Sequence, residues 1–292
     1  MNSKDYVSLV TRIIRKPEWL KVKLPHSKEF NRVKRVLKSY NLHSVCQEAL
    51  CPNITECFHS GTATFLVLGD ICTRNCRYCN ITSGIPRPID EEEPKHLTDA
   101  VKKLGLQYIV ITSVTRDDLS DGGAEIFARC VELLHEHITD CRVEVLIPDL
   151  HGNWDALDSI IAAGPDVINH NMETVKPLFE SIRPQGDYRI SLELLRRIKD
   201  RKKTVVTKSG FMIGLGEEWN DILALMKDLA DVECDRLTIG QYQQPTLNHW
   251  PVHKYYHPGE FDDLKQIAEQ MGFQSVEAGP LVRSSYHAAR MA

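Results

Sequence analysis

The hydrophobic positions of the chain follow two alternating patterns: short β-branched runs and longer segments with helical spacing. The short runs predict strands at Thr62–Leu68, Tyr108–Ser113, Arg142–Ile147, Asp166–Asn169, Thr204–Ile213 and Arg236–Gln241. Helical spacing predicts helices between them, near residues 94–104, 123–138, 153–163, 189–200 and 217–231. A further helical segment, Glu260–Met271, precedes a last short run, Phe273–Glu277. The sequence therefore predicts an α/β protein in which strands and helices alternate.

Six β–α repeats in series predict a parallel sheet with right-handed crossovers. We expect a partial (β/α)6 barrel of the TIM type, because a doubly wound nucleotide-binding sheet would carry a G-x-G-x-x-G turn. The nearest glycine pair, Gly122-Gly123, lacks that spacing. The barrel would span residues 61–259, between an N-terminal extension (1–60) and a C-terminal extension (260–292). In barrels the chemistry lies on loops at the carboxyl ends of the strands.

The N-terminal extension combines a basic helix with a cysteine-rich segment. The apolar residues of the helix follow helical spacing at Phe30, Val33, Leu37 and Tyr40. Ser27 is a candidate N-cap for this helix, and we expect a loop over residues 43–60. Residues 1–40 hold eleven basic and three acidic residues, a net charge of +8, whereas the whole chain carries −4. This asymmetry is typical of a docking surface or of a solvated amphipathic arm.

Composition excludes several classes of protein. The chain has 292 residues, of which 42% are hydrophobic, so it can form a core without disulfides. No apolar run approaches the ~20 residues of a membrane span, and the basic segment lacks the interleaved aromatic residues of a nucleic-acid-binding surface. The short apolar stretch Tyr6–Val10 argues against a secretory signal, and nine cysteines argue against a secreted disulfide framework. We therefore expect a cytoplasmic protein that binds neither membranes nor nucleic acid. We also expect a monomer, because nothing in the sequence suggests an obligate dimer.

Three cysteines, Cys72, Cys76 and Cys79, follow the first strand directly. Three thiolates at this spacing can ligate three irons of a cubane cluster and leave the fourth iron open to the amino and carboxylate groups of a small molecule. A zinc site would need four ligands, and no Cys or His follows Cys79 within ten residues. The loop therefore predicts an iron–sulfur cluster at the active end of the barrel.

A second triplet, Cys46, Cys51 and Cys57, precedes the barrel. It predicts a second cluster, which needs a fourth ligand from elsewhere in the chain or an exchangeable one. A loosely packed cysteine-rich linker is the alternative. The remaining cysteines predict no site: Cys130 falls on the apolar face of a helix, where it would be a small core residue. A zinc site built from Cys130, His135, His137 and Cys141 is disfavoured, because His135 and His137 point about 200° apart on a helix.

The pattern Cys-x3-Cys-x-Tyr-Cys after the first strand resembles the radical S-adenosylmethionine (SAM) superfamily. With the upstream Cys-x4-Cys-x5-Cys, the chain resembles the lipoyl synthase family within it. The resemblance covers nearly the whole chain and includes the segments Thr112–Leu119, Asp121–Ala124, His170–Val175, Lys208–Met212, Leu237–Tyr242 and Arg283–Ala288. It implies two [4Fe–4S] clusters and SAM as cofactors. It also implies that Ser285, with Ser284 as the close second, supplies the fourth ligand of the auxiliary cluster at Cys46, Cys51 and Cys57.

The resemblance further implies an activity and its partners. In the family, two sulfur atoms from the auxiliary cluster are inserted at C6 and C8 of a protein-bound octanoyl-lysyl group. The implied partners are an octanoylated carrier domain (a 2-oxoacid dehydrogenase E2 or glycine cleavage H protein), an electron donor such as flavodoxin or ferredoxin, and an iron–sulfur carrier that repairs the cluster. An acidic carrier could be steered by basic residues of the N-terminal segment, with Lys16, Lys21, Lys23 and Lys28 as candidates.

Polar residues at the strand ends are candidate contacts for SAM. They are Tyr78, Thr112, Ser113, Asn169, Asn171, Glu173, Arg183 and Gln241. The arginine could pair with an α-carboxylate, although strand ends also need ordinary caps. Two other functions stay open on the residues alone. One is a radical SAM sulfurtransferase that acts on a small molecule or tRNA, and the other is an iron–sulfur electron carrier or scaffold.

Overall fold

The structure, a computed structural model, describes residues 15–22, 28–60, 63–286 and 288–291. Its main sheet has the strand order β1-β2-β5-β6-β7-β8-β9-β10. The strands are β1 (His43–Ser44), β2 (Thr64–Val67), β5 (Tyr108–Ser113), β6 (Arg142–Leu146), β7 (Val167–Asn169), β8 (Val206–Ile213), β9 (Arg236–Gln241) and β10 (Ser275–Gly279). All neighbours pair in parallel except β1 and β2. Two edges remain, so the barrel is open, as the sequence predicted.

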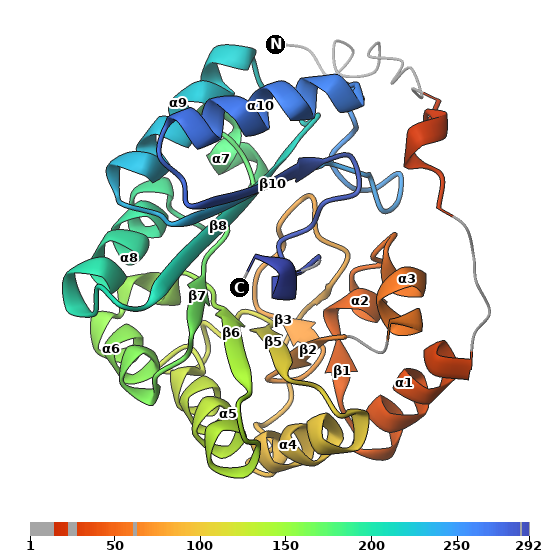
Figure 1. Ribbon diagram of the computed structural model, residues 1–292, viewed down its shortest axis with the longest axis vertical. Helices are drawn as coiled ribbons and strands as arrows, with labels where there is room; N and C mark the ends of the chain where they lie inside the picture. The colour runs from red at the N-terminus through yellow and green to blue at the C-terminus, as the bar shows by residue number, and fades with distance from the viewer. Residues whose placement is uncertain (1–14, 23–27, 61–62, 287, 292) are drawn as a thin grey trace.

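Helices cover the convex face of this sheet (Figure 1). They are α4 (Glu93–Leu104), α5 (Ala124–His137), α6 (Trp154–Ala163), α7 (Lys176–Ile182), α8 (Tyr188–Arg201), α9 (Trp219–Asp231) and α10 (Pro258–Gln270). The repeats predicted from hydrophobic spacing are confirmed, apart from the short helix α7, which the spacing did not reveal. β10 confirms the last short strand predicted at Phe273–Glu277, shifted by two residues, and it pairs in parallel with β9. The helix α10 begins two residues before its predicted start at Glu260. The division into 1–60, 61–259 and 260–292 stays a prediction.

Most of the N-terminal region stands beside the β1–β2 edge of the sheet, whereas its first turn lies near the start of α10, where Trp19 packs against His257 (Figure 1). It contains η1 (Glu18–Leu20), α1 (Lys28–Ser39), α2 (Val45–Glu48) and α3 (Ile54–His59). The loop expected over residues 43–60 is therefore wrong, because α2 and α3 occupy much of that segment. They are four and six residues long, too short to show a helical period. The candidate cap Ser27 and the candidate docking residue Lys23 lie outside the described residues.

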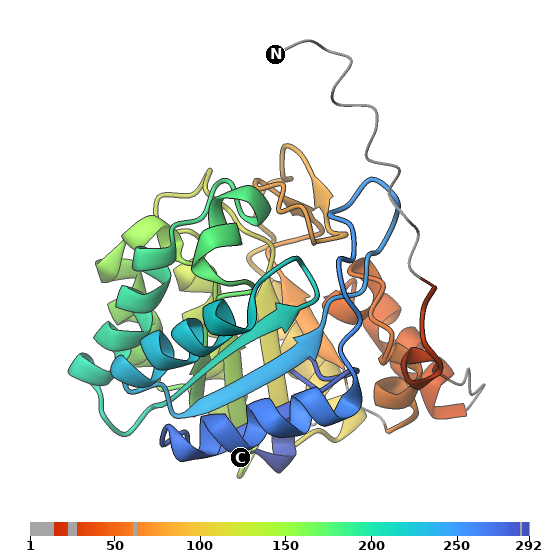
Figure 2. The same ribbon diagram turned by 90° about the horizontal axis from the view of Figure 1, so that it is seen from above.

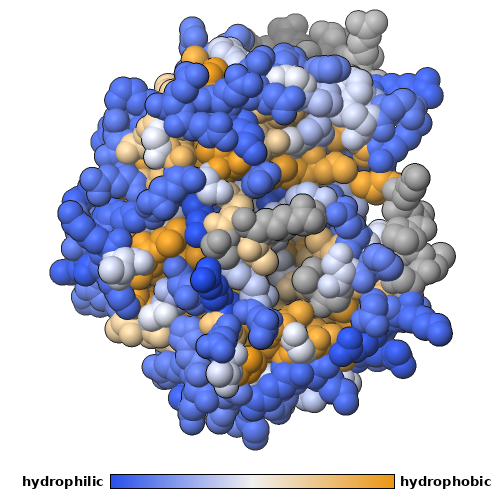
Figure 3. Space-filling view, viewed as in Figure 1, coloured by the Kyte–Doolittle hydropathy of each residue, from blue (hydrophilic) through white to orange (hydrophobic). Residues whose placement is uncertain are grey.

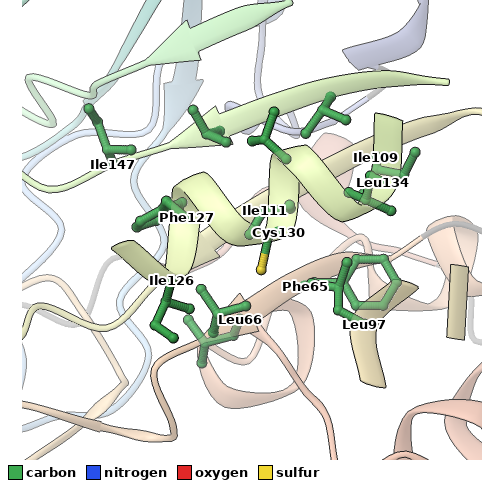
Figure 4. Close-up of a cluster of buried hydrophobic side chains, with 14 of the residues drawn as sticks. Phe65, Leu66, Leu97, Ile109, Ile111, Ile126, Phe127, Cys130, Leu134 and Ile147 are labelled. Carbon is green, nitrogen blue, oxygen red and sulfur yellow. The ribbon is translucent and has the colours of Figure 1, made fainter. Parts of the chain in front are cut away.

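The core lies between the sheet and its helices. In the half around β2, β5 and α5, Phe65, Ile111, Phe127 and Cys130 meet with no exposed surface (Figure 4). A second apolar cluster forms around β8, β9 and α10. No helix in the described part of the chain is long and apolar enough to cross a membrane.

The C-terminal segment leaves β10 and turns back toward the inside of the barrel. In Figure 1 it lies in the middle of the ring of strands, and the 90° view of Figure 2 shows the same segment beneath the strands. Its last turn, η3 (Ala288–Arg290), contacts β5. The segment is therefore placed to close the inside of the barrel from one end.

Candidate active site

The loop with the first cysteine triplet is framed by a small sheet of β3 (Ile71–Cys72) and β4 (Thr82–Ser83). Hydrogen bonds connect this cysteine loop to the loop that follows β5. The Thr73 amide and hydroxyl both donate to the carbonyl oxygen of Thr115, at 3.0 Å each. The Cys72 sulfur accepts the backbone N–H groups of Arg74 at 3.4 Å and Thr115 at 3.3 Å. These contacts fix the position of the Cys72 sulfur between the two loops.

Arg74, inside this loop, ties three loops together. Its guanidinium donates two hydrogen bonds to Asp117, after β5, and two to Asp149, after β6, at 2.7–2.9 Å. The Arg74 side chain is only 4% exposed. Although burial raises the pKa of Asp149, hydrogen bonds from Arg74 outweigh it and lower that pKa to about 2. The sequence analysis missed this ion pair, whose only signal is an arginine between the cysteines and aspartates after two strands.

The other two cysteines of the first triplet lie in a less polar setting. Burial raises the pKa of Cys76, and it raises that of Cys79 to about 12. A thiol with such a pKa stays protonated at neutral pH until a metal displaces the proton. These raised pKa values argue against a role as nucleophile for the two cysteines.

The second triplet is arranged around α2 and α3. Cys46 is in α2, Cys57 is in α3, and Cys51 lies between the helices. Burial is the main cause that raises the pKa of Cys46 to about 11 and that of Cys57 to about 12, and the charge of Cys51 is a smaller cause of both shifts. Electrostatic coupling of this kind means that the sulfur atoms gather in one place, which suits a shared metal group.

The C-terminal segment packs against these cysteine helices. The Asn53 side chain donates to the Leu281 carbonyl oxygen at 2.6 Å, and the Tyr286 hydroxyl donates to the Glu56 carboxylate at 2.9 Å. Gly240 in β9 permits the approach, since a Cβ there would lie 2.2 Å from the Val282 carbonyl oxygen. The chain thus brings Ser284 and Ser285 to the same region as the second cysteine triplet.

A cavity of about 590 Å³ inside the barrel joins these parts. Five of the six triplet cysteines line it, namely Cys46, Cys51, Cys72, Cys76 and Cys79, together with Ser284 and Ser285. Cys57 is not among the lining residues. Apolar side chains such as Leu66, Val114 and Phe211 form much of the wall. The face of the molecule at which the C-terminal segment lies also shows apolar surface inside a polar rim (Figure 3). Such a cavity fits a ligand with an extended apolar part.

Six of the eight predicted SAM contacts line the cavity: Tyr78, Thr112, Ser113, Asn171, Glu173 and Arg183. The other two are not among its lining residues. Asn169 donates to Glu144 at 3.1 Å in the interior of the barrel. Gln241 uses its amide to hold the backbone, because it donates to the Ile213, Tyr242 and Lys254 carbonyls and accepts the Tyr256 N–H. Lys16 reaches the cavity wall, where burial and Arg283 lower its pKa.

Several buried polar atoms at the cavity have no hydrogen-bond partner in the described structure. They are Ser113 Oγ, His170 Nε2, Asn171 Oδ1 and Arg183 Nε. Buried polar groups are normally paired, so this set calls for a polar ligand or ordered water. His170 was not predicted. Its Nδ1 donates to the Ile147 carbonyl at 2.8 Å, which makes Nε2 an acceptor, and burial lowers its pKa to about 4.

The donor sets fit iron–sulfur clusters better than a single metal ion. Among the described residues, no three His, Cys, Asp or Glu side chains converge closely enough to hold one ion. A cluster spaces its thiolate ligands further apart than one ion does, and each triplet offers three thiols, the ligand type that such clusters use. The polar atoms beside the first triplet, with Arg183, fit a charged amino-acid moiety such as that of SAM.

The remaining cysteines lie away from the cavity. Cys130 is fully buried in the core against Phe127, as predicted (Figure 4). His135, which the zinc alternative would require, lies 3.6 Å from Asp166 instead. Because the described side chains offer no three-ligand group for a single ion, the zinc alternative has no support.

Comparison with known proteins agrees with this geometry. Residues 66–229 match the Radical SAM superfamily, and residues 5–51 match the N-terminal domain of lipoyl synthase of the Radical SAM family. The chain is 52% identical over 281 residues to a lipoyl synthase of Chloroflexus aggregans, which covers 96% of this chain and 92% of the relative. It is 50% identical over 275 residues to a lipoyl synthase of Caldanaerobacter subterraneus, which covers 94% and 96%.

Solved structures share the fold at low sequence identity. Methylornithine synthase aligns with a TM-score of 0.54 and 12% identity over 87% of this chain and 79% of that one. HydG, a maturase of the [FeFe]-hydrogenase, aligns with a TM-score of 0.55 and 13% identity over 89% and 63%. At such identity the likeness concerns the fold alone. Because relatives at about half identity span almost the whole chain, it belongs to the lipoyl synthase family of the radical SAM superfamily.

Proposed function

We propose that this chain is a lipoyl synthase that inserts two sulfur atoms, at C6 and C8, into a protein-bound octanoyl-lysyl group. The observation that carries the proposal is that five of the six triplet cysteines and the serine motif line one cavity with apolar walls. An electron carrier would need neither an open iron nor an enclosed cavity. A sulfurtransferase for tRNA or a free small molecule is disfavoured, because the relatives across nearly the whole chain are lipoyl synthases.

The first triplet would hold the cluster that binds SAM, and the second triplet with Ser285 would hold the auxiliary cluster. A serine oxygen is a hard ligand among soft thiolates, so it should be one of the more easily lost ligands. When bound, the two clusters and SAM supply the one-electron reduction, the radical and the sulfur. The protein's own task is to hold these groups around one substrate and to exclude water.

Four side chains would orient SAM. The Arg183 guanidinium, whose Nε has no partner in the described structure, would pair with the carboxylate. Ser113 and Asn171 would bind polar groups through their unpartnered oxygens. Tyr78 would cover the ligand from the cysteine loop. The apolar wall, which includes Leu66, Val114 and Phe211, would enclose the octanoyl chain and keep its carbons near the reacting groups.

The substrate would arrive on a carrier domain, and the basic N-terminal segment is a candidate docking surface. Lys21 and Lys28 are exposed. We expect reversal of both charges (Lys21→Glu/Lys28→Glu) to raise the KM for an acidic carrier at low salt. The effect should fade near 0.15 M salt, where the Debye length is about 8 Å. A KM that stays unchanged at low salt would remove this docking surface from the proposal.

An anaerobic assay of the reconstituted protein tests the function. Wild type should hold about eight irons, four for each [4Fe–4S] cluster. With SAM, dithionite and an octanoylated peptide it should yield 5′-deoxyadenosine and a dithiolated peptide. Cys72→Ala should lose deoxyadenosine, whereas Cys51→Ala should keep deoxyadenosine and lose sulfur transfer. Cys130→Ala, in the core, is the matched control and should keep both. Deoxyadenosine without sulfur in the peptide, from wild type, would mean another substrate.

A further inference from the structure

A hydrogen bond joins the first cysteine loop to the end of β7. Tyr78, next to Cys79, and Glu173 both line the cavity, and the Tyr78 hydroxyl donates to the Glu173 carboxylate. Burial raises the pKa of Glu173, and this contact lowers it, as Arg183 and Asn171 also do. A phenylalanine would fill the same space without this bond. The hydroxyl therefore adds a connection that packing alone does not supply.

Glu173 is held rigidly for this contact. Its φ of 66° is in the left-handed region, which is costly for a residue with a side chain. Two backbone hydrogen bonds to β8 hold it there: Glu173 N–H donates to the Gly210 carbonyl at 3.1 Å, and Met212 N–H donates to the Glu173 carbonyl at 3.0 Å. Strain that is fixed by its surroundings is typical of functional positions.

Asn171 extends the connection to the C-terminal segment. Its Nδ2 donates to Glu173 Oε1 at 2.9 Å and to the Ser284 hydroxyl oxygen at 3.3 Å. The absence of a side chain at Gly210 leaves room for Asn171, since a Cβ there would lie 3.1 Å from Asn171 Oδ1. One amide group thus bridges β7 and the motif that precedes Ser285.

We propose that Tyr78, Glu173, Asn171 and Ser284 form a hydrogen-bonded link through which each cysteine site affects the other. Tyr78 is a positioning residue in this link, because it acts on the serine motif only through Glu173 and Asn171. While Asn171 engages Ser284, the neighbouring Ser285 is held beside the second triplet. A ligand that draws Asn171 or Glu173 toward itself at the first site breaks the link and loosens the serine motif.

The physiological meaning of the link rests on the proposed function, because it assumes that the triplets hold the two clusters. The link would then make loss of the serine ligand depend on SAM at the first site. The auxiliary cluster, which donates the sulfur, would stay intact until SAM has bound at the first triplet. Coupling of this kind is reciprocal by thermodynamic necessity. A change at Ser284 must therefore also alter the stability of the loop that contains Tyr78.

Hydrogen exchange of the full-length protein tests the link without any need for activity. We expect Tyr78→Phe to speed amide exchange in residues 279–286 about fivefold, the factor that corresponds to about 1 kcal/mol for one hydrogen bond. Ser284→Ala should speed exchange in residues 72–84 in return. SAM, added to the reconstituted wild type, should speed exchange in residues 279–286, and this response should be smaller in Tyr78→Phe.

The matched control is Tyr188→Phe, which removes a hydroxyl that donates to Asp228 at 2.7 Å, between α8 and α9. It should leave exchange in both segments unchanged. If Tyr78→Phe folds and also leaves residues 279–286 unchanged, the link does not exist. Wild type that makes no lipoyl product but shows the reciprocal exchange effects would overturn the proposed function and keep the link. Iron release to a chelator from the second site, faster in Tyr78→Phe than in Tyr188→Phe, is a second supporting readout.

Discussion

Arg74 donates two hydrogen bonds of 2.7 Å to the carboxylate of Asp149, and both side chains are nearly excluded from solvent. The residues are 75 positions apart, and the pair connects the cysteine loop to the loop after β6. The same guanidinium also holds Asp117, so one side chain sets the position of three loops. Loops that must hold a metal group are normally fixed in this way, by contacts beyond the ligands themselves.

We expect Arg74→Lys to weaken both folding and metal retention. Lysine keeps the charge but cannot make paired hydrogen bonds to two carboxylates. A partly broken buried ion pair should lower the free energy of unfolding by about 2–3 kcal/mol. Denaturant titration measures this change, and iron analysis after gel filtration measures retention at the first triplet. Arg129→Lys, in an exposed pair with Glu132, is the control and should change neither.

Glu93 should make stability depend on pH. Its carboxylate accepts the Leu68 N–H at 2.7 Å, and burial raises its pKa from 4.5 to about 6. The folded protein therefore binds this proton more tightly than the unfolded chain. The stabilising contribution is complete below about pH 4.5 and is lost as pH rises through 6, a change of about 2 kcal/mol. Glu93→Gln should lack this component in denaturant titrations at pH 4.5 and 7, and equal pH dependences would contradict the assignment.

Gly240→Ala should separate the C-terminal segment from β9 and so displace the serine motif. The new Cβ would lie 2.2 Å from the Val282 carbonyl oxygen, so the backbone that leads to the serine motif must move. If the second triplet depends on that motif, iron content should fall from about eight to about four per chain. Gly259→Ala is the control, because a Cβ there meets ordinary contact distances at the start of α10. An unchanged iron content in Gly240→Ala would show that the motif is dispensable for metal retention.

The buried pair Lys208–Glu144 should be sensitive to removal of one partner. Both side chains have no exposed surface, and Lys208 Nζ lies 2.9 Å from Glu144 Oε1. Lys208→Met leaves a carboxylate buried without a cation and should cost about 3–5 kcal/mol of unfolding free energy. The double change Lys208→Met/Glu144→Gln should recover part of this loss. Lys227→Met, in an exposed pair on α9, should have little effect, and an equal loss in both single variants would refute the argument.

The sequence predicted those features that depend on local pattern. Strand and helix positions follow from hydrophobic spacing, and the Cys72 loop lies after β2 as the barrel rule requires. The Arg74–Asp149 pair could not be predicted from the sequence, because it joins two loops that become neighbours only when the sheet has folded. The strand-end rule also found Asn171 and Glu173 but did not separate them from Asn169 and Gln241. Asn169 and Asn171 lie two positions apart, so the alternation of side chains along a strand does not separate them. Their place relative to the strand does, because Asn169 is the last residue of β7 and donates to Glu144 in the interior, whereas Asn171 follows the strand.

The contacts between α2–α3 and the C-terminal segment have a consequence for assembly. Asn53 and Leu281 are separated by 228 positions, and Glu56 and Tyr286 by 230. Contacts of such separation form late, because closure of a long loop must precede them. The loop of the first triplet makes contacts with residues up to 250, because His249 binds the Cys79 carbonyl at 3.0 Å and the Trp250 N–H donates to the Arg77 carbonyl at 2.8 Å. Its surroundings therefore need less of the chain than those of the second triplet. The second triplet has no complete setting until residue 286 has emerged, so its metal centre is necessarily the last part of the molecule to mature.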